Sequence, residues 1–379
     1  MRLPEPGRET HGVTIEASAK GTGGKLLTLE AGRFFAALAV LLYHLTSIVA
    51  NFRGVVVFDD VFRPGHVGVP YFFVLSGFII FHVHRRDIGH PGALGRFAIR
   101  RFIRIYPMFW MISFAMLAAF LVAPGLGGER ALSPAGVVSD LLLLPHGDAI
   151  LSISWTLRHE IMFYALFALA IWLGRRAFAA LLLWIVVSFA LGLVWPPDQN
   201  GLGAWSVVAS SLNLGFGLGI VTAAMLARPS VAPPWLWVLL GGGLLFGLGI
   251  MEWILGHHTD LSVSVLGALG DVGYLVASAV LIYGLAKAEE HWTLPFPALW
   301  KLLGGASYLI YLIHQPLLSV IMRVLNRLPA LSPEMAFVLS AVVAVAVAVA
   351  LHWTVERWIL RRLQSFFALR AASAAKGPA

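Results

Sequence analysis

The sequence predicts an all-α, polytopic transmembrane bundle of about ten spans, with both termini in the cytoplasm. The 379 residues are 59% hydrophobic and only 12% charged, whereas soluble domains carry about 25% charged residues. The apolar residues are gathered in runs close to the roughly 20 residues that a helix needs to cross a bilayer. Lysine and arginine concentrate in alternate connections, which is typical of loops that stay in the cytoplasm.

Ten apolar runs define the expected elements. They cover residues 26–50, 65–83, 105–123, 152–173, 177–195, 204–226, 235–255, 263–286, 301–322 and 334–355. Proline, glycine and paired arginines mark several boundaries, such as Ile105-Tyr106-Pro107, Gly174-Arg175-Arg176, Trp195-Pro196-Pro197 and Arg228-Pro229. We expect a disordered cytoplasmic tail over 1–25, one transmembrane domain over 26–358, and a second cytoplasmic tail over 359–379. The polar start of the chain does not resemble a signal peptide.

Charge and composition exclude several classes of function. The net charge of +8 comes from arginine clusters in the connections, so it predicts topology and contact with membrane lipids, not binding of nucleic acid. The sequence has no cysteine, which excludes disulfides, thiolate metal sites and a covalent cysteine intermediate. The histidine pairs lack matching ligands, and no metal site is expected.

The first span carries two ionisable residues, Arg33 and His44. Eleven residues correspond to three helical turns plus about 20°, so both side chains lie on one face, roughly 16 Å apart along the axis. Ionisable groups inside a span usually face a protein interior or a wet cavity. The pair therefore indicates a channel-like site. A snorkelling arginine and a histidine bonded to a neighbouring helix are the structural alternative.

Glu160 lies about 12 Å along the fourth span, counted from its outer end at about 1.5 Å per residue. On this count Glu160 and His44 could meet in the outer half of the membrane. A carboxylate beside an imidazole favours a general base acting on a hydroxyl. A structural buried pair, or a Glu160 that binds substrate directly, remains open.

Other spans contain polar residues at helical spacing. Arg96, Arg100, Arg101 and Arg104 share one broad face and suit either a polyphosphate ligand or anionic lipid heads. Ser307, Tyr311 and His314 share a face of the ninth span, where cavity lining is favoured over structural pairing. Ser76-Gly77 and the glycines at 215, 217 and 219 permit close helix crossings, or in the second span a slot for a thin ligand.

Five segments together resemble acyltransferase family 3. They are Arg33 through His44, Phe72-Phe73-Val74-Leu75-Ser76-Gly77-Phe78, Arg101 through Pro107, Ser154 through Glu160, and Ser307 through His314. Within that family the sequence is most similar to proteins that decorate exopolysaccharides or O-antigens. The resemblance implies O-acylation, commonly O-acetylation, of a carbohydrate by cytoplasmic acyl-CoA in the bacterial plasma membrane. The resemblance likewise implies a carbohydrate acceptor, either free or lipid-linked.

The resemblance also implies roles for particular residues. His44 would be the catalytic base or a transient acyl carrier, and Glu160 would lie in or near the active site. Arg33, Arg101 and Arg104 would contact the phosphates of acyl-CoA. The residues expected to line the substrate cavity are Ser76, Trp155, Ser307, Tyr311 and His314.

Two other classes of function fit the same residues. A transporter or flippase for a lipid-linked sugar or a small acyl compound could use Arg33, His44, Glu160 and Asp271 as a substrate and proton path. A membrane scaffold within a polysaccharide synthesis complex would need none of them for chemistry. Consumption of acyl-CoA distinguishes the enzyme from both.

Overall fold

The computed structural model describes residues 26–122, 133–145, 149–197, 203–258 and 265–375. The tail expected over 1–25 lies outside these residues. The described chain is all-helical, without strands, and ten of its helical segments are long and apolar enough to cross a membrane. The predicted fold class and span number are therefore confirmed.

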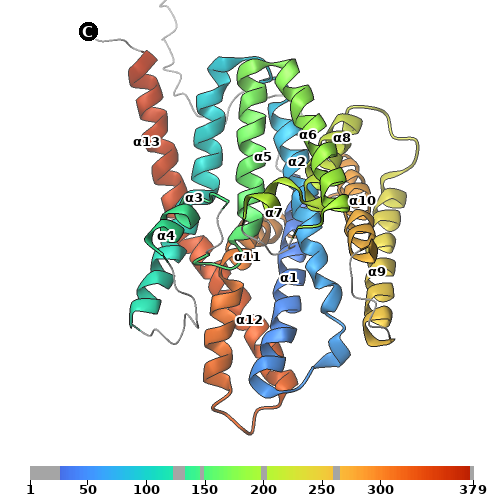
Figure 1. Ribbon diagram of the computed structural model, residues 1–379, viewed down its shortest axis with the longest axis vertical. Helices are drawn as coiled ribbons and strands as arrows, with labels where there is room; N and C mark the ends of the chain where they lie inside the picture. The colour runs from blue at the N-terminus through green and yellow to red at the C-terminus, as the bar shows by residue number, and fades with distance from the viewer. Residues whose placement is uncertain (1–25, 123–132, 146–148, 198–202, 259–264, 376–379) are drawn as a thin grey trace, which may run out of the picture.

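The helices form one bundle (Figure 1). In chain order they are α1 (Leu27–Arg53), α2 (Gly68–His84), α3 (Leu94–Val122), α4 (Pro134–Leu141), α5 (Ser154–Leu173), α6 (Arg175–Val194), α7 (Ala204–Val208), α8 (Leu214–Leu226), α9 (Pro234–His258), α10 (Val265–Ala288), α11 (Pro297–Leu325), α12 (Pro333–Leu351) and α13 (Arg357–Ala375). Short 3-10 turns connect several of them, including η2 (Arg63–Val67) and η5 (Ser211–Asn213), and a π-helical turn, His352–Glu356, joins α12 to α13.

Two boundaries differ from the sequence prediction. Helix α3 begins at Leu94, not at residue 105, so the arginines at 96–104 belong to the spanning helix. The tenth span continues through the π-helical turn into α13, which is helical beyond residue 358. Apolar runs alone gave boundaries that were too short, because arginine is a good helix former and does not end a helix.

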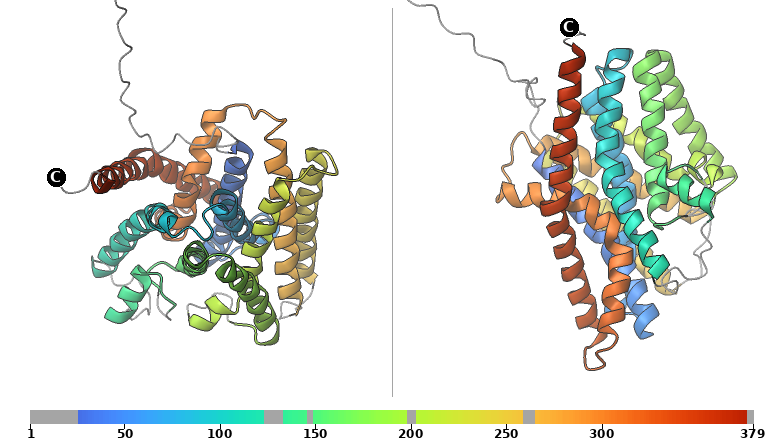
Figure 2. Two further views of the ribbon diagram at one scale, coloured as in Figure 1. Left: turned by 90° about the horizontal axis from the view of Figure 1, so that it is seen from above. Right: turned by 90° about the vertical axis from the view of Figure 1, so that its left-hand side faces the viewer.

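The core of the bundle is built on three close helix pairs, α1 with α11, α2 with α8, and α9 with α10. Seen from above, α1 and α2 lie near the middle, with α3 and α13 on one side and α9 and α10 on the other (Figure 2). Glycines allow the α2–α8 crossing, since a Cβ on Gly77 would overlap the carbonyl of Phe216 and a Cβ on Gly219 would overlap that of Val74. The predicted close approach is confirmed there.

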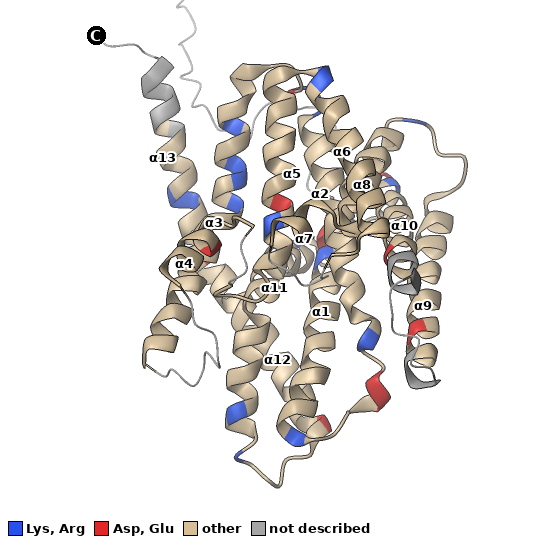
Figure 3. Cartoon of the chain, viewed as in Figure 1, with Lys and Arg blue, Asp and Glu red and all other residues tan. Residues whose placement is uncertain are grey.

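The arginine-rich connections gather at one end of the bundle, here called the basic end. The connections α2–α3 and α5–α6 meet there, and the backbone N–H of Gly89 donates to the carbonyl of Ala170 over 3.2 Å. Basic residues lie along the first half of α3 and at the start of α6 (Figure 3). The α1–α2 connection lies at the opposite end (Figure 1), so α1 leads from the basic end to the opposite end.

Candidate active site

Helix α1 holds both Arg33 and His44, and its apolar neighbours pack against α11. The Arg33 side chain is only 18% exposed, and its Nη1 lies 3.8 Å from Oε1 of Glu30 on the preceding turn. The charges of Arg104 and Glu160 also act on Arg33. A guanidinium within the bundle is therefore balanced by carboxylates and lies near a second arginine.

Arg33, Arg101 and Arg104 form the arginine cluster of the site. Nη1 of Arg104 lies 3.7 Å from Oε1 of Glu356, whose side chain is almost fully buried in the π-helical turn. The Arg104 guanidinium also stacks over the ring of Tyr308, 5.3 Å from its centroid. Arg33 and Arg104 thus each have a buried carboxylate partner, which keeps them in place within an apolar environment.

Arg101 differs from these two arginines. Its guanidinium stacks over the ring of Tyr164 at 5.6 Å, and its buried Nε has no hydrogen-bond partner among the described residues. Arg96 and Arg100, predicted to share its face, are exposed. Arg101 therefore has donor capacity left for a ligand at the edge of the bundle.

Glu160 lies at the arginine end of the site and does not contact His44. Its Oε1 accepts hydrogen bonds from Ser76 of α2, over 3.2 Å, and from Tyr164. Among the described residues, Glu160 has no hydrogen bond or ion pair with His44, so the expected meeting of the two is not what the structure shows. The reason is that the two residues lie at different levels of the bundle. Ser152 lies level with His44, since Gln315 contacts both, and Glu160 is eight residues further along the chain, about 12 Å at 1.5 Å per residue.

His44 is held by Gln315 of α11. The Gln315 side-chain nitrogen lies 3.3 Å from Nδ1 and 3.2 Å from Nε2 of His44, and its side-chain oxygen accepts a hydrogen bond from Ser152. The rings of His44 and His314 lie against each other, with centroids 5.1 Å apart. His44 itself is partly exposed, so its ring is fixed on one side and accessible on another.

The predicted cavity residues of α11 have different surroundings. His314 is buried, its Nδ1 lies 2.6 Å from the carbonyl oxygen of Tyr311, and its Nε2 has no hydrogen-bond partner among the described residues. The Tyr311 hydroxyl lies 3.0 Å from that of Thr156 on α5. Ser307 is fully buried and donates to the carbonyl of Gly304 in its own helix. Tyr311 and His314 thus lie between Glu160 and His44.

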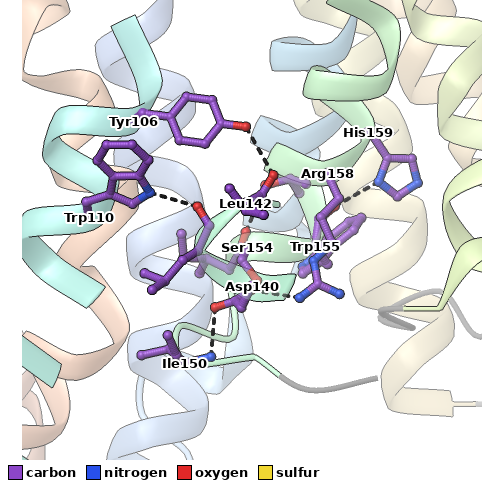
Figure 4. Close-up of polar contacts among 12 residues, drawn as sticks. Tyr106, Trp110, Asp140, Leu142, Ile150, Ser154, Trp155, Arg158 and His159 are labelled. Carbon is purple, nitrogen blue, oxygen red and sulfur yellow. Dashed lines mark hydrogen bonds and ion pairs between the residues drawn. The ribbon is translucent and has the colours of Figure 1, made fainter. Parts of the chain in front are cut away.

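A buried ion pair fixes the start of α5, where Trp155 lies (Figure 4). Arg158 Nη2 donates to Oδ1 of Asp140 over 2.7 Å, and neither side chain is exposed. Asp140 also accepts hydrogen bonds from the Ser154 hydroxyl, over 2.7 Å, and from the backbone N–H of Ile150, over 2.9 Å. Trp155 is partly buried one residue after Ser154. This network sets the position of the segment that holds Gln315.

Sequence reasoning missed three residues of the site. Gln315 was overlooked because it is uncharged, although it directly follows His314. Tyr164 lies one helical turn after Glu160, a spacing that could have indicated the contact. Glu356 follows His352 at the same spacing, and its Oε2 lies 2.7 Å from Nδ1 of His352, but the tenth span was expected to end before it.

The described residues contain no group of three or more histidine or acidic side chains placed to hold a metal ion. The arrangement instead offers arginines at one end of a line of polar groups and a partly exposed imidazole at the other end. Arg33 and His44 mark its two ends, and Glu160, Tyr311 and His314 lie between them. This set can bind an anion and transfer a proton.

Comparison with known proteins gives two findings. Residues 26–353 match a family model described as an acyltransferase domain, acyltransferase family 3. The chain is also similar to the exopolysaccharide production protein ExoZ of Rhizobium meliloti (strain 1021), with 27% identity over 315 residues, covering 79% of this chain and 91% of that protein. No solved structure matches.

Proposed function

Because the chain belongs to acyltransferase family 3, we propose that it is an integral-membrane O-acyltransferase acting on carbohydrate. The donor is cytoplasmic acyl-CoA, acetyl-CoA in the simplest case. The acceptor is a hydroxyl of a cell-surface or exported saccharide, free or lipid-linked. The similarity to an exopolysaccharide production protein supports this acceptor class, and ten apolar helices support a multi-pass membrane protein. We propose that it lies in the bacterial plasma membrane.

The donor phosphates would be held at the basic end. Arg101 has a buried Nε without a partner among the described residues, and guanidinium groups bind phosphates through paired charge-assisted hydrogen bonds. The exposed Arg100 adds positive charge one residue away. Arg33 and Arg104, already balanced by carboxylates, would flank the path that the thioester arm takes into the bundle.

The chemical step would take place at His44. A neutral His44 nitrogen takes the proton from the acceptor hydroxyl while the hydroxyl oxygen attacks the thioester carbonyl carbon. The carbon–sulfur bond breaks, and the leaving thiolate recovers that proton from His44. An ester and the free thiol of CoA are formed, so protons and electrons balance. Gln315 orients the ring before the acceptor arrives, and the acceptor hydroxyl then replaces the Gln315 amide at the nitrogen that takes the proton.

The proposed orientation places the basic end and both termini in the cytoplasm, as the distribution of arginines favours. Because the sequence contains no cysteine, single cysteines test this directly. A cysteine at exposed Arg86 should be protected from an impermeant maleimide in intact cells, and one at exposed Glu334 should react. The reverse pattern would contradict the orientation.

One observation carries the proposal: Arg33 and His44 lie on one helix, roughly 16 Å apart at 1.5 Å per residue, with polar side chains between them. The test is turnover of acetyl-CoA by the full chain in nanodiscs with methyl hexosides as acceptors. Released CoA can be measured with a thiol reagent, since the chain contributes no thiol. We expect ester and thiol to appear in equal amounts.

Two results would contradict the proposal. One is that the wild-type chain neither binds nor consumes acetyl-CoA. The other is that proteoliposomes move a labelled lipid-linked sugar across the bilayer while acetyl-CoA stays intact, which is the behaviour of a transporter.

A further inference from the structure

A second group of polar side chains lies near His44 and has no part in the mechanism above. We call it the polar cluster, and it consists of His66, Ser211, Glu252, Asp271 and Tyr274. Its members come from four separate elements, η2, η5, α9 and α10. Carboxylates within membrane spans are costly and mark functional sites by default, and two of them lie in this cluster.

The cluster is hydrogen-bonded but has acceptor capacity left. Nε2 of His66 lies 2.9 Å from both carboxylate oxygens of Glu252, and the Tyr274 hydroxyl donates to Oε2 of Glu252 over 2.7 Å. Ser211 donates to Oδ2 of Asp271 over 3.0 Å. A carboxylate offers about four acceptor positions, so Asp271 in particular can accept further hydrogen bonds. The side chains of His66 and Glu252 are 33% and 30% exposed, and a ligand can reach them.

The ring of Tyr43 connects the cluster to His44. The centroid of Tyr43 lies 4.8 Å from that of His44 and 5.7 Å from that of His66. The ring of His66 in turn lies 5.4 Å from that of Tyr274. On the other side of His44, His314 is almost fully buried and its Nε2 has no hydrogen-bond partner among the described residues. Aromatic rings therefore extend without interruption from a histidine with free hydrogen-bonding capacity to a pair of carboxylates.

This combination selects a class of ligand. Aromatic rings offer flat apolar surfaces with polar edges, and carboxylates accept hydrogen bonds from hydroxyl groups. A saccharide presents both an apolar ring face and several hydroxyl donors. Arg63 also lies near Glu252, but its charge is balanced by Asp60, 3.5 Å away. Within the cluster only the imidazole of His66 then faces the carboxylates of Glu252 and Asp271, which would therefore repel an anionic ligand. A neutral sugar fits and a uronate does not.

We infer that the polar cluster and Tyr43 form the acceptor subsite, which binds a neutral saccharide and directs one of its hydroxyl groups to His44. The inference rests on the proposed O-acyltransferase function and adds the acceptor class and the residues that bind it. The subsite lies beside His44, across the ring of Tyr43, whereas Arg33 lies roughly 16 Å away along α1, so donor phosphates and acceptor approach the reacting centre from different directions.

The first test separates acceptor binding from donor binding. Glu252→Gln and Asp271→Asn keep the shape of each side chain and remove its charge. With acetyl-CoA and methyl glucoside, galactoside or mannoside, we expect each variant to raise the KM for the preferred hexoside at least tenfold. Binding of acetyl-CoA, and its hydrolysis without saccharide, should stay within twofold of wild type. Glu334→Gln, an exposed carboxylate at the start of α12, is the matched control and should leave all three values unchanged.

Several outcomes would overturn the inference. One is that Glu252→Gln and Asp271→Asn have the same KM for the hexoside as wild type. Another is that they lose acetyl-CoA binding as strongly as they lose hexoside binding. Transfer to methyl glucuronide as efficient as to methyl glucoside would refute the neutral class. If wild type binds and hydrolyses acetyl-CoA but acylates no hexoside, the subsite inference fails and the donor half of the proposed function stands. If wild type does not bind acetyl-CoA, the proposed function itself fails.

A second test does not depend on catalysis or on the stability of the charge variants. A single cysteine at Ser211, next to Asp271, should react with a maleimide in a chain that otherwise lacks thiols. The preferred methyl hexoside should slow this labelling at least threefold and should not slow labelling of a cysteine at position 334. Equal labelling rates at position 211 with and without hexoside would contradict the inference.

Discussion

The buried ion pair between Asp140 and Arg158 provides the strongest stability prediction. Both side chains are fully buried, so Asp140→Asn removes the negative charge that lies 2.7 Å from the Arg158 guanidinium. Breaking a buried ion pair by removing one charge costs about 3–5 kcal/mol. At about 2 °C per kcal/mol for a chain of this size, Tm should fall by roughly 6–10 °C. Activity should fall as well, because the same network positions Ser152, which holds Gln315 at His44.

The assay is thermal unfolding of the purified chain, followed by the fluorescence of its 13 tryptophans. Asp60→Asn is the matched control, since its ion pair with Arg63, 3.5 Å long, is 23% and 40% exposed and should contribute less than about 1 kcal/mol. The double variant Asp140→Leu/Arg158→Met should not recover the loss fully: apolar residues can replace the buried ion pair, but the buried donors of Ser154 and Ile150 lose their acceptor. A fall in Tm for Asp140→Asn no larger than for Asp60→Asn would refute the reasoning.

Three further predictions concern single side chains. Gln315→Leu should lower kcat/KM for the saccharide about tenfold with acetyl-CoA binding unchanged, because the free enzyme loses the hydrogen bond of about 1.4 kcal/mol that orients the imidazole; unchanged kcat/KM would contradict this. Arg101→Gln should weaken acetyl-CoA binding about tenfold in a titration, since hydrogen bonds to charged groups contribute about 1.5–3 kcal/mol, while exposed Arg96→Gln should change it less than twofold. Gly219→Ala should lower Tm, because the new Cβ overlaps a backbone carbonyl of α2, while Gly242→Ala, which meets no atom within 4 Å, should not.

Much of the fold could be predicted from the sequence because membrane spans impose a length and a composition that are visible in one chain. Sites of close helix approach were also visible, because Gly77 and the glycines at 215, 217 and 219 lack side chains. The sequence did not show that α2 and α8 are partners, and Gly217 faces Ile185 of α6 instead. The start of α3 could not be predicted from hydropathy, because the arginines at 96–104 interrupt the apolar run although the helix continues through them.

The candidate site was predicted less completely, for a geometric reason. Counting residues gave the depth of Glu160 in its own helix, but spans end at different levels in the bundle. Ser152, next to the start of α5, lies level with His44, so Glu160 lies nearer the arginines, where it contacts Ser76. The role of Gln315 depends on a contact between α1 and α11, which the pattern within a single helix does not show.

The central claim is that His44 transfers the proton in an acyl transfer whose donor binds at the arginine cluster. The most direct test measures acetyl-CoA binding and saccharide-dependent turnover in parallel for wild type and His44→Ala in nanodiscs. The account predicts binding within twofold of wild type and turnover lower by about 10²–10⁴-fold, the usual contribution of a general base. Turnover by His44→Ala at the wild-type rate, in protein that folds and binds acetyl-CoA normally, would contradict it.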